Sequence, residues 1–433
     1  MLKLTVETVG ELSPERREAI VKRSAVDVSA VFEDIRKIVQ DVRQYGDRIT
    51  LDYHRQFKAQ ISASDLEAKP EEIRAAYDHL DPKLLAALKI AAGNIEKFHR
   101  AQLDREMWAI EVQPGILAGR LLRPLDRAGC YIPGGLAKYP STVLMTIIPA
   151  RVAGVREIIA CTPPDQGMSA NATTLAAAHL AGAHRIFKIG GPWAVASMAY
   201  GTATVPKVDK IVGPGNKYVT AAKLAVFGEV GIDNPAGPSE ALILADETAE
   251  ARMVALDFLS QVEHDPDAAA VLVTTWEPLA HKVIDFIKEE LPSLPRREIL
   301  VNAINHHSAV LLAENLDEAV DFVNFYAPEH LQIVTKEPFA VLPRIRHAGS
   351  IFLGRYAPVP VGDYASGTNH VLPTGQTARM FSGLSVDDFL KKPTFQHLTR
   401  EGLRSLKDAV ILMAEAEGLP LHARAVAERF RYV

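Results

Sequence analysis

The sequence predicts an α/β protein built from doubly wound parallel sheets. Between residue 130 and about residue 312, short apolar runs that end in glycine or proline alternate with stretches of helical apolar spacing. Strands that alternate with helices form parallel sheets, because each crossover helix returns the chain to the end of the sheet where the previous strand began. The 433 residues also exceed what one hydrophobic core usually serves, so two or three packing units are expected.

The first part of the chain, up to about residue 110, is predicted to be helical. Apolar residues recur every three to four positions in segments 31–39 and 84–91. This spacing is typical of helices that bury one face. These helices are therefore expected to pack as amphipathic layers.

Strands, turns and a helical tail are predicted for the rest of the chain. The clearest strands lie at 156–161, 185–189, 241–245 and 269–273, and the turn-rich segments lie at 133–135, 190–192, 213–216 and 236–240. In open α/β sheets such loops lie at the carboxyl ends of strands, where ligands bind. After a loop from Asp363 to His370, a mainly helical tail is expected, with one helix ending near Gly418 and another beginning at Pro420.

Composition limits the kinds of partner. The chain is 48% hydrophobic and 23% charged and has a net charge of −5, which gives no electrostatic reason to bind nucleic acid or anionic lipid. It has neither a basic leader with an apolar run nor the roughly 18 apolar residues of a membrane span. A cytoplasmic protein that binds small molecules and other protein chains is expected. Cys130 and Cys161, each in an apolar context, are interpreted as buried, inert thiols.

Gln261 and His264 are the first candidate metal ligands. They lie three residues apart at the end of an amphipathic run, so they are predicted to share one helical face. An imidazole and an amide on one face can ligate a metal, although amides are uncommon zinc ligands. A purely structural role for the pair remains the alternative.

Glu329 and His330 form a candidate acid/base pair. A histidine can take a hydroxyl proton at neutral pH, and a carboxylate can activate water. Adjacent residues do not face each other on a helix, so the pair needs a helix start or a turn, and Ala327-Pro328 is interpreted as a helix start. The alternative is an exposed glutamate in a first helical turn, where it complements the helix dipole.

Four further polar residues complete the candidate set. Asp363 and His370 bracket a loop, while Glu417 precedes Gly418 and His422 is expected in a first helical turn. Solvated loop positions and ordinary helix capping are the alternatives. Together with the two pairs above, these residues suffice for one divalent metal site and one acid/base pair.

A nucleotide or phosphate ligand is indicated by the glycine-rich junctions at 190–191 and 213–216. Backbone amides at a helix start can hold a pyrophosphate, and glycine permits its close approach. The dinucleotide fingerprint of three spaced glycines followed by an acidic residue does not occur.

Seven motifs follow one another along the chain: Tyr131–Gly135, Tyr139–Met145, Val208–Asn216, Ala236–Glu240, Gln261–His264, Ala327–Leu331 and Gly362–Thr374. With these motifs in this order, the chain resembles the histidinol dehydrogenase family over nearly its whole length. The resemblance implies two incomplete Rossmann-like domains, one inserted in the other, with helical terminal extensions. The implied boundaries are an N-terminal extension at 1–26, one domain at 27–130 with 240–383, an inserted NAD-binding domain at 131–239, and a tail at 384–433 that reaches a partner subunit.

The resemblance also implies the site residues and the cofactors, Zn²⁺ and NAD. Zinc ligands carry over to Gln261, His264 and Asp363 of one subunit and His422 of the other, which implies a homodimer with shared active sites. Glu329 and His330 are the implied catalytic pair. Substrate contacts carry over to Ser239, His330, His370, Glu417 and the metal ligands, and NAD contacts to Tyr131, Asn216 and the position of Trp193.

Two positions depart from the family pattern. The family usually has glutamine where this chain has Trp193, and the indole can donate one hydrogen bond but cannot accept one. The family tends to carry methionine where this chain has Asn234. Trp193 occupies a position to which an NAD contact carries over, and Asn234 lies near Ser239, to which a substrate contact carries over.

The function that the resemblance implies is oxidation of L-histidinol to L-histidine through L-histidinaldehyde, with two NAD. Zinc has no second accessible oxidation state, so hydride must leave to NAD. The alternatives are a related zinc and NAD enzyme for another small alcohol such as a sulfonated diol, a zinc hydrolase with Glu329 as base, and a non-catalytic metal-binding protein.

Overall fold

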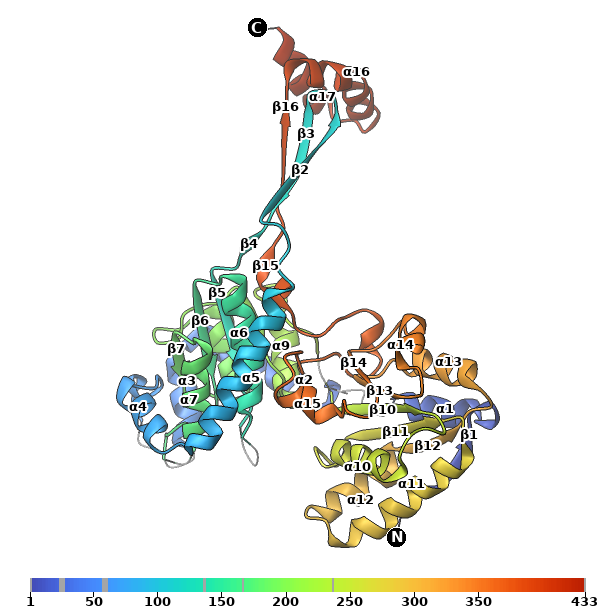
Figure 1. The fold of residues 1–433 in the computed structure, drawn as a ribbon. Coiled ribbons are helices and arrows are strands. Elements are labelled where there is room, and N and C mark those ends of the chain that lie inside the picture. The colour runs from blue at the N-terminus through green and yellow to red at the C-terminus, as the bar shows by residue number, and fades with distance from the viewer. Residues whose placement is uncertain are drawn as a thin grey trace. The chain divides into compact units, whose positions relative to one another are not determined.

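The computed structural model describes residues 2–22, 28–56, 61–134, 138–165, 167–235 and 237–431 (Figure 1). The chain divides into two compact units. The larger unit comprises Met1–Gln102 with Asp126–Phe389, and the smaller comprises Leu103–Leu125 with Leu390–Val433. Gly135 and Ala236, which belong to two of the motifs, lie outside the described residues.

The larger unit contains a six-stranded sheet in which every paired neighbour is parallel. Its strand order is β1-β12-β11-β10-β13-β14. The strands are β1 (Val6–Thr8), β10 (Glu240–Ala245), β11 (Ala269–Thr274), β12 (Ala309–Leu312), β13 (His330–Val334) and β14 (Ser350–Leu353). The first described strand therefore lies at one edge of a sheet that is otherwise built from residues 240–353.

Helices cover both faces of this sheet, as the doubly wound prediction required (Figure 1). Successive residues of a strand point to opposite faces. Ile243 packs with α10 (Ala251–Val262), α11 (Glu277–Glu290) and α12 (Arg297–His307). Leu242 and Leu244 pack with α1 (Pro14–Val21), α13 (Leu316–Tyr326) and α14 (Pro338–Val341). Because β10 is buried on both faces, its residues 241–245 form a continuous apolar run.

A second, five-stranded parallel sheet has the order β7-β6-β5-β8-β9. Its strands are β5 (Arg127–Tyr131), β6 (Glu157–Cys161), β7 (Arg185–Phe187), β8 (Lys210–Val212) and β9 (Gly231–Ile232). These strands lie in sequence between β1 and β10, so one sheet is inserted in the other, as expected. Its helices are α6 (Pro140–Ala153), α7 (Ala172–Ala181), α8 (Gly191–Tyr200) and α9 (Lys217–Val226).

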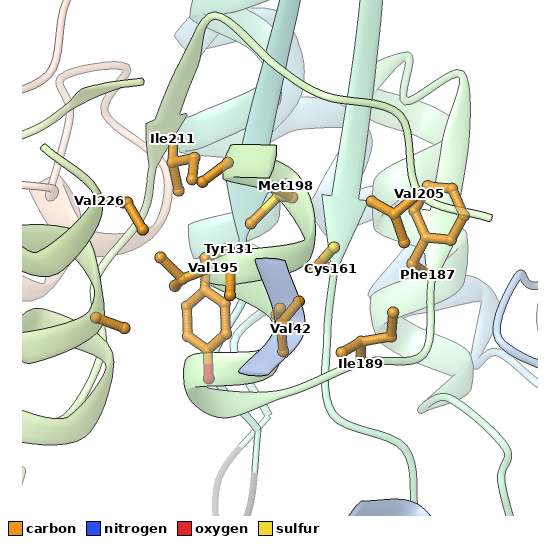
Figure 2. Close-up of a cluster of buried hydrophobic side chains, with 14 of the residues drawn as sticks. Val42, Tyr131, Cys161, Phe187, Ile189, Val195, Met198, Val205, Ile211 and Val226 are labelled. Carbon is orange, nitrogen blue, oxygen red and sulfur yellow. The ribbon is translucent and has the colours of Figure 1, made fainter. Parts of the chain in front are cut away.

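Residues 29–100 pack against the second sheet's helices rather than with the first sheet. The segment forms α2 (Ser29–Tyr45), α3 (Asp47–Arg55), α4 (Pro70–Asp78) and α5 (Pro82–Arg100). Helix α2 packs on α8 and α9, α4 on α7, and α5 on α6. Figure 2 shows Val42 of α2 among Phe187, Val195 and Met198. This packing differs from the expected grouping of 27–130 with 240–383, because apolar periodicity predicts a helix but not the surface it covers.

The smaller unit combines a three-stranded antiparallel sheet with two helices. Its strands are β2 (Met107–Gln113), β3 (Ile116–Leu121) and β16 (Thr394–Leu398), and β4 (Arg123–Pro124) pairs with β15 (Leu390–Lys391). The helices are α16 (Arg400–Ala416) and α17 (Pro420–Ala427). The tail from residue 384 is mainly helical, as expected, but it also contains two short strands, not predicted from the sequence, that pair with residues 116–124.

The local predictions agree well with the structure elsewhere. The four clearest strand predictions coincide with β6, β7, β10 and β11, and the two helical segments lie within α2 and α5. Cys130 and Cys161 are both buried and free, and burial raises the pKa of the Cys130 thiol to about 12. No helix of the described residues has the length and hydropathy that a bilayer span needs.

The remaining elements are short. They are α15 (Val359–Tyr364) and single turns of 3-10 helix at Val9–Glu11, Ala63–Asp65, Leu291–Ser293, Leu342–Arg344, Thr377–Arg379, Val386–Phe389 and Glu428–Phe430.

Candidate functional site

The catalytic candidates lie where the parallel strands of the first sheet begin, which is called its amino edge below. Ser239 directly precedes β10, and His330 is the first residue of β13, the strand beside β10. The expectation that the turn at 236–240 lies at a strand's carboxyl end is therefore wrong. The turn at 236–240 precedes its strand in the chain, so chain direction places it at the strand's amino end, and the general rule for ligand-binding loops does not apply to it.

Glu329 is held by a chain of hydrogen bonds. Its Oε2 accepts hydrogen bonds from Ser239 Oγ at 2.8 Å and from the Glu240 backbone N–H at 2.8 Å. Ser239 Oγ in turn accepts from Gln261 Nε2 at 3.0 Å. Glu329 is only 5% exposed, which excludes the alternative of a solvated glutamate in a first helical turn.

The local backbone that presents Glu329 also differs from expectation. Helix α13 ends at Tyr326, and Ala327 adopts a φ of +50°, a left-handed conformation that terminates the helix. Ala327-Pro328 is therefore a helix end and not a helix start. The chain turns there directly into β13.

His330 lies between two carboxylates. Its Nδ1 is 3.0 Å from the Glu240 carbonyl oxygen, which can only accept, so Nδ1 carries the proton. Glu329 Oε2 lies 3.4 Å from Nδ1, and Asp363 Oδ1 lies 3.6 Å from Nε2. Burial alone lowers the pKa of His330, but the two carboxylates outweigh it and raise that pKa well above the usual value.

Asp363 lies in α15, at the start of the predicted loop. Burial would raise the pKa of this carboxyl group, but contact with His330 and the nearby imidazoles of His370 and His264 lower it overall. A deprotonated carboxylate is the form that binds a metal ion.

Gln261 lies in the last turn of α10 and brings an unsatisfied oxygen to the cluster. Its amide nitrogen donates to Ser239, while its buried Oε1 has no hydrogen-bond partner among the described residues. A buried oxygen without a donor is costly unless a ligand supplies the missing interaction. His264 lies two residues beyond the helix end and is exposed, so the two residues do not share a regular helical face.

Gln261, His264 and Asp363 could supply three of the four ligands of a tetrahedral zinc ion. An amide oxygen, an imidazole and a carboxylate are three suitable ligand types. The described residues contain no group of three or more His, Cys, Asp or Glu arranged to hold a metal. A fourth donor would have to come from elsewhere.

His370 is tied down at both ring nitrogens. Its Nδ1 donates to the Asp363 carbonyl oxygen at 2.9 Å, and Nε2 is 3.0 Å from Thr142 Oγ1 in α6. Burial lowers the pKa of His370. Thr142 was not among the sequence candidates, because nothing local connects it with a residue 228 positions away.

Glu417 and His422 belong to the smaller unit and are both exposed. Glu417 caps the end of α16, and His422 lies in the first turn of α17, as predicted. Gly418 between the two helices has a φ of +73°, the left-handed conformation expected of a helix-terminating glycine.

The expected dinucleotide residues gather at the carboxyl edge of the second sheet. Tyr131 ends β5, and its hydroxyl accepts a hydrogen bond from the Gly191 N–H at the start of α8 at 3.2 Å. Burial raises the pKa of Tyr131 to about 12. Figure 2 shows its ring within the buried cluster beside Val42 and Val195.

Asn216 and Trp193 lie on the two following helices. Asn216 caps α9, where its Oδ1 accepts from the N–H groups of Tyr218 and Val219 at 3.1 and 3.2 Å. Trp193, in the first turn of α8, stacks on Tyr53 with ring centroids 3.5 Å apart. One face of the indole is therefore already covered by Tyr53 of α3.

The geometry of this edge suits a nucleotide. From β5 the chain adds β6 and β7 on one side of the sheet, and it adds β8 and β9 on the other side. The direction in which successive strands are added therefore reverses between β5 and β8. Ligands of open α/β sheets bind at this switch point. Tyr131 lies on one side of this point and the 213–216 turn on the other, and the positive ends of the α8 and α9 helix dipoles, which favour an anion, lie at the same edge.

Comparisons with known proteins agree with each other. The family model described as histidinol dehydrogenase matches residues 21–430. The histidinol dehydrogenase of Methanothermobacter thermautotrophicus is 50% identical over 98% of this chain and 99% of its own length, and that of Clostridium acetobutylicum is 43% identical over 98% of each. The crystal structure of histidinol dehydrogenase from Elizabethkingia anophelis superposes with a TM-score of 0.92 at 38% identity, covering 99% of this chain and 98% of that one. The chain therefore belongs to the histidinol dehydrogenase family.

Proposed function

We propose that this protein oxidises L-histidinol to L-histidine through L-histidinaldehyde, the closing steps of histidine biosynthesis, in the cytoplasm. Full-length similarity to proteins named histidinol dehydrogenase supports the substrate. The observation that carries the chemistry is the Ser239–Glu329–His330–Asp363 cluster, in which Glu329 and His330 are buried. Overall, the alcohol, water and two NAD⁺ give the acid, two NADH and two protons, with a third proton released as the acid ionises.

Zinc would hold and orient the amino alcohol, and NAD would accept the hydride of each oxidation. The proposed ligands are Gln261, His264 and Asp363 of one subunit and His422 of the partner subunit. The unpartnered Gln261 Oε1 supports this set, since a cation supplies the interaction that the buried oxygen lacks.

His330 and Glu329 divide the proton transfers. His330 Nε2 faces Asp363, whereas Nδ1 is held by the Glu240 carbonyl, so Nε2 is the nitrogen that can exchange a proton with the alcohol. Glu329 is proposed to activate the water that hydrates the aldehyde, and His330 assists the second oxidation. Ser239, His370 and the partner subunit's Glu417 are proposed to bind the substrate. Burial of Glu329 and His330 limits escape and side reactions of the aldehyde.

A homodimer is proposed because the smaller unit exposes many large apolar side chains. Met107, Ile110 and Val112 of β2 are 57–60% exposed, and Leu412 and Leu421 are 66% and 74% exposed. Large apolar side chains exposed in this number mark an interaction surface. A partner that covers it would also supply His422 to the incomplete zinc set.

The decisive experiment is the amount of NADH formed per molecule of limiting L-histidinol, with zinc-loaded protein and excess NAD. A ratio near two supports both oxidations. A ratio near one means that the aldehyde leaves and that Glu329 lacks the assigned role. No NADH redirects the assignment to another small alcohol.

The shared site has its own test. Inactive His422→Ala and His264→Ala chains are mixed under conditions in which hybrid dimers form. Hybrids contain one site with both mutations and one intact site, so about half of the wild-type activity per hybrid is expected. If hybrids are shown to form and no activity returns, His422 acts within its own subunit.

A further inference from the structure

The turn after β8 depends on a residue that can only be glycine. Gly213 has a φ of +120°, and a Cβ there would lie 2.1 Å from the Tyr131 carbonyl oxygen and 3.0 Å from its carbon. The turn therefore rests directly on the last residue of β5. Any shift of the Gly213 peptide groups changes the position of the turn relative to Tyr131.

Two buried charges hold both backbone groups of Gly213. Asp233 Oδ2 accepts a hydrogen bond from the Gly213 N–H at 2.6 Å, and Lys223 Nζ donates to the Gly213 carbonyl oxygen at 3.1 Å. Lys223 and Asp233 also form an ion pair with each other, and their side chains are only 5% and 4% exposed. Lys223 lies on α9 and Asp233 directly follows β9, so three segments are joined at this one residue.

Stability alone does not account for this arrangement. Removing two charges from water carries a large desolvation penalty, and apolar side chains of similar volume often serve stability equally well. What an apolar pair cannot do is bond to both backbone groups of a residue in an uncommon conformation. The charged pair therefore determines the orientation of the peptide groups that lead into Asn216 and α9.

We propose that the Lys223–Asp233 ion pair is a positioning device for the dinucleotide: it fixes the Gly213–Asn216 turn against Tyr131 at the switch point of the second sheet. The inference rests on the proposed function, which assigns the dinucleotide to this edge. Neither charged group needs to touch the ligand. Both act through the backbone of Gly213 and through the helix start that Asn216 caps.

The test measures dinucleotide binding without turnover. NAD is titrated by calorimetry into the zinc-loaded, full-length protein in the absence of histidinol, and histidinol is titrated separately in the absence of NAD. The variants are Lys223→Met and Asp233→Asn. The Asp233→Asn variant keeps an acceptor for the Gly213 N–H but removes the charge. The matched control is Lys188→Met, which breaks another pair on the same sheet: Lys188, 5% exposed, bonds to Glu72 at 2.8 Å.

Lys223→Met is expected to raise the Kd for NAD about tenfold or more, the size of one lost charge-assisted hydrogen bond. Asp233→Asn should raise it less, and Lys188→Met should leave it within about twofold. Histidinol binding should remain within about twofold in all three variants. If the ion pair served folding stability alone, its loss would weaken the binding of both NAD and histidinol, or of neither.

A double variant keeps the test informative if Lys223→Met does not fold. Lys223→Met with Asp233→Leu removes both charges, so no unpaired charge stays buried, and a folded protein with weakened NAD binding is expected. Unchanged NAD binding in a folded double variant overturns the inference and leaves the proposed function standing. A wild-type protein that binds no NAD overturns the proposed dinucleotide and the inference with it.

Discussion

The two parallel sheets share one architecture but present their candidate functional residues at opposite edges. In the first sheet, charged side chains gather at the amino edge, where α10 ends at Val262 and α13 at Tyr326. In the second, glycine turns and helix starts gather at the carboxyl edge, where α8 and α9 begin. Helix ends carry partial negative charge and helix starts partial positive charge. The first edge therefore suits a cation and the second suits the anionic phosphates of a dinucleotide.

The largest effects are expected from substitutions at the amino edge of the first sheet. His330→Asn should slow both oxidations by about 10²–10⁴-fold, because proton transfer at the alcohol is lost. Glu329→Gln should slow the oxidation of supplied histidinaldehyde more than the first oxidation of histidinol. Single-turnover rates with each substrate measure both effects. Equal losses for the two substrates in Glu329→Gln would contradict the division of roles, and NAD affinity should not change in either variant.

The next test asks whether the first edge holds a cation. Gln261→Ala is expected to weaken zinc binding by at least about 10–100-fold, because removal of a residue that only supports a metal ligand already has an effect of this size. Zinc content after dialysis against a zinc buffer measures this. Gln332→Ala is the matched control, because Gln332 is equally buried in β13 but donates to Asp257, outside the cluster. Equal zinc content in both variants would argue against Gln261 as a ligand.

A smaller effect is expected at the second edge. Trp193→Gln restores the residue usual in the family and removes the stack on Tyr53. Loss of such an aromatic pair costs about 1 kcal/mol of folding free energy. NAD affinity should change by a few fold while zinc content stays constant. A loss of zinc in this variant would show that the two edges are not independent.

The smallest expected effect is a pH dependence of the free energy of unfolding, and it arises in the helices that cover the second sheet. Burial lowers the pKa of His54 in α3 to about 4, so the folded state binds a proton less readily than the unfolded state. The stability it contributes is fully present above pH 6.5 and declines as the pH falls toward 4. Between pH 6.5 and 5.5 this amounts to about 1 kcal/mol. Urea unfolding at both pH values should show a smaller pH difference in His54→Phe, and an unchanged difference would exclude His54 as the source.

Local patterns predicted the buried elements well, because strands such as β10 and β11 are apolar on both faces and bounded by turn residues. Ser239 was expected at the wrong end of β10 because the rule that ligands bind after strands was applied to a turn that precedes its strand. Proline after Ala327 was misinterpreted because a helix can end just before proline as well as begin with it. Pairings such as Thr142 with His370 leave no local signal. The Gln261 and His422 assignments depended on the family resemblance.

The pairing of β1 with β12 has a consequence for how the protein is made. Val6 lies opposite Val310, about 300 residues later in the chain. On the ribosome, the helices of residues 29–100 and the second sheet are complete long before the partner of β1 has been synthesised. The second sheet can therefore fold early, while β1 must wait as an unpaired strand until the first sheet closes over it. Newly made chains that stop short of residue 309 are expected to be aggregation-prone, with protease cleavage beginning near β1.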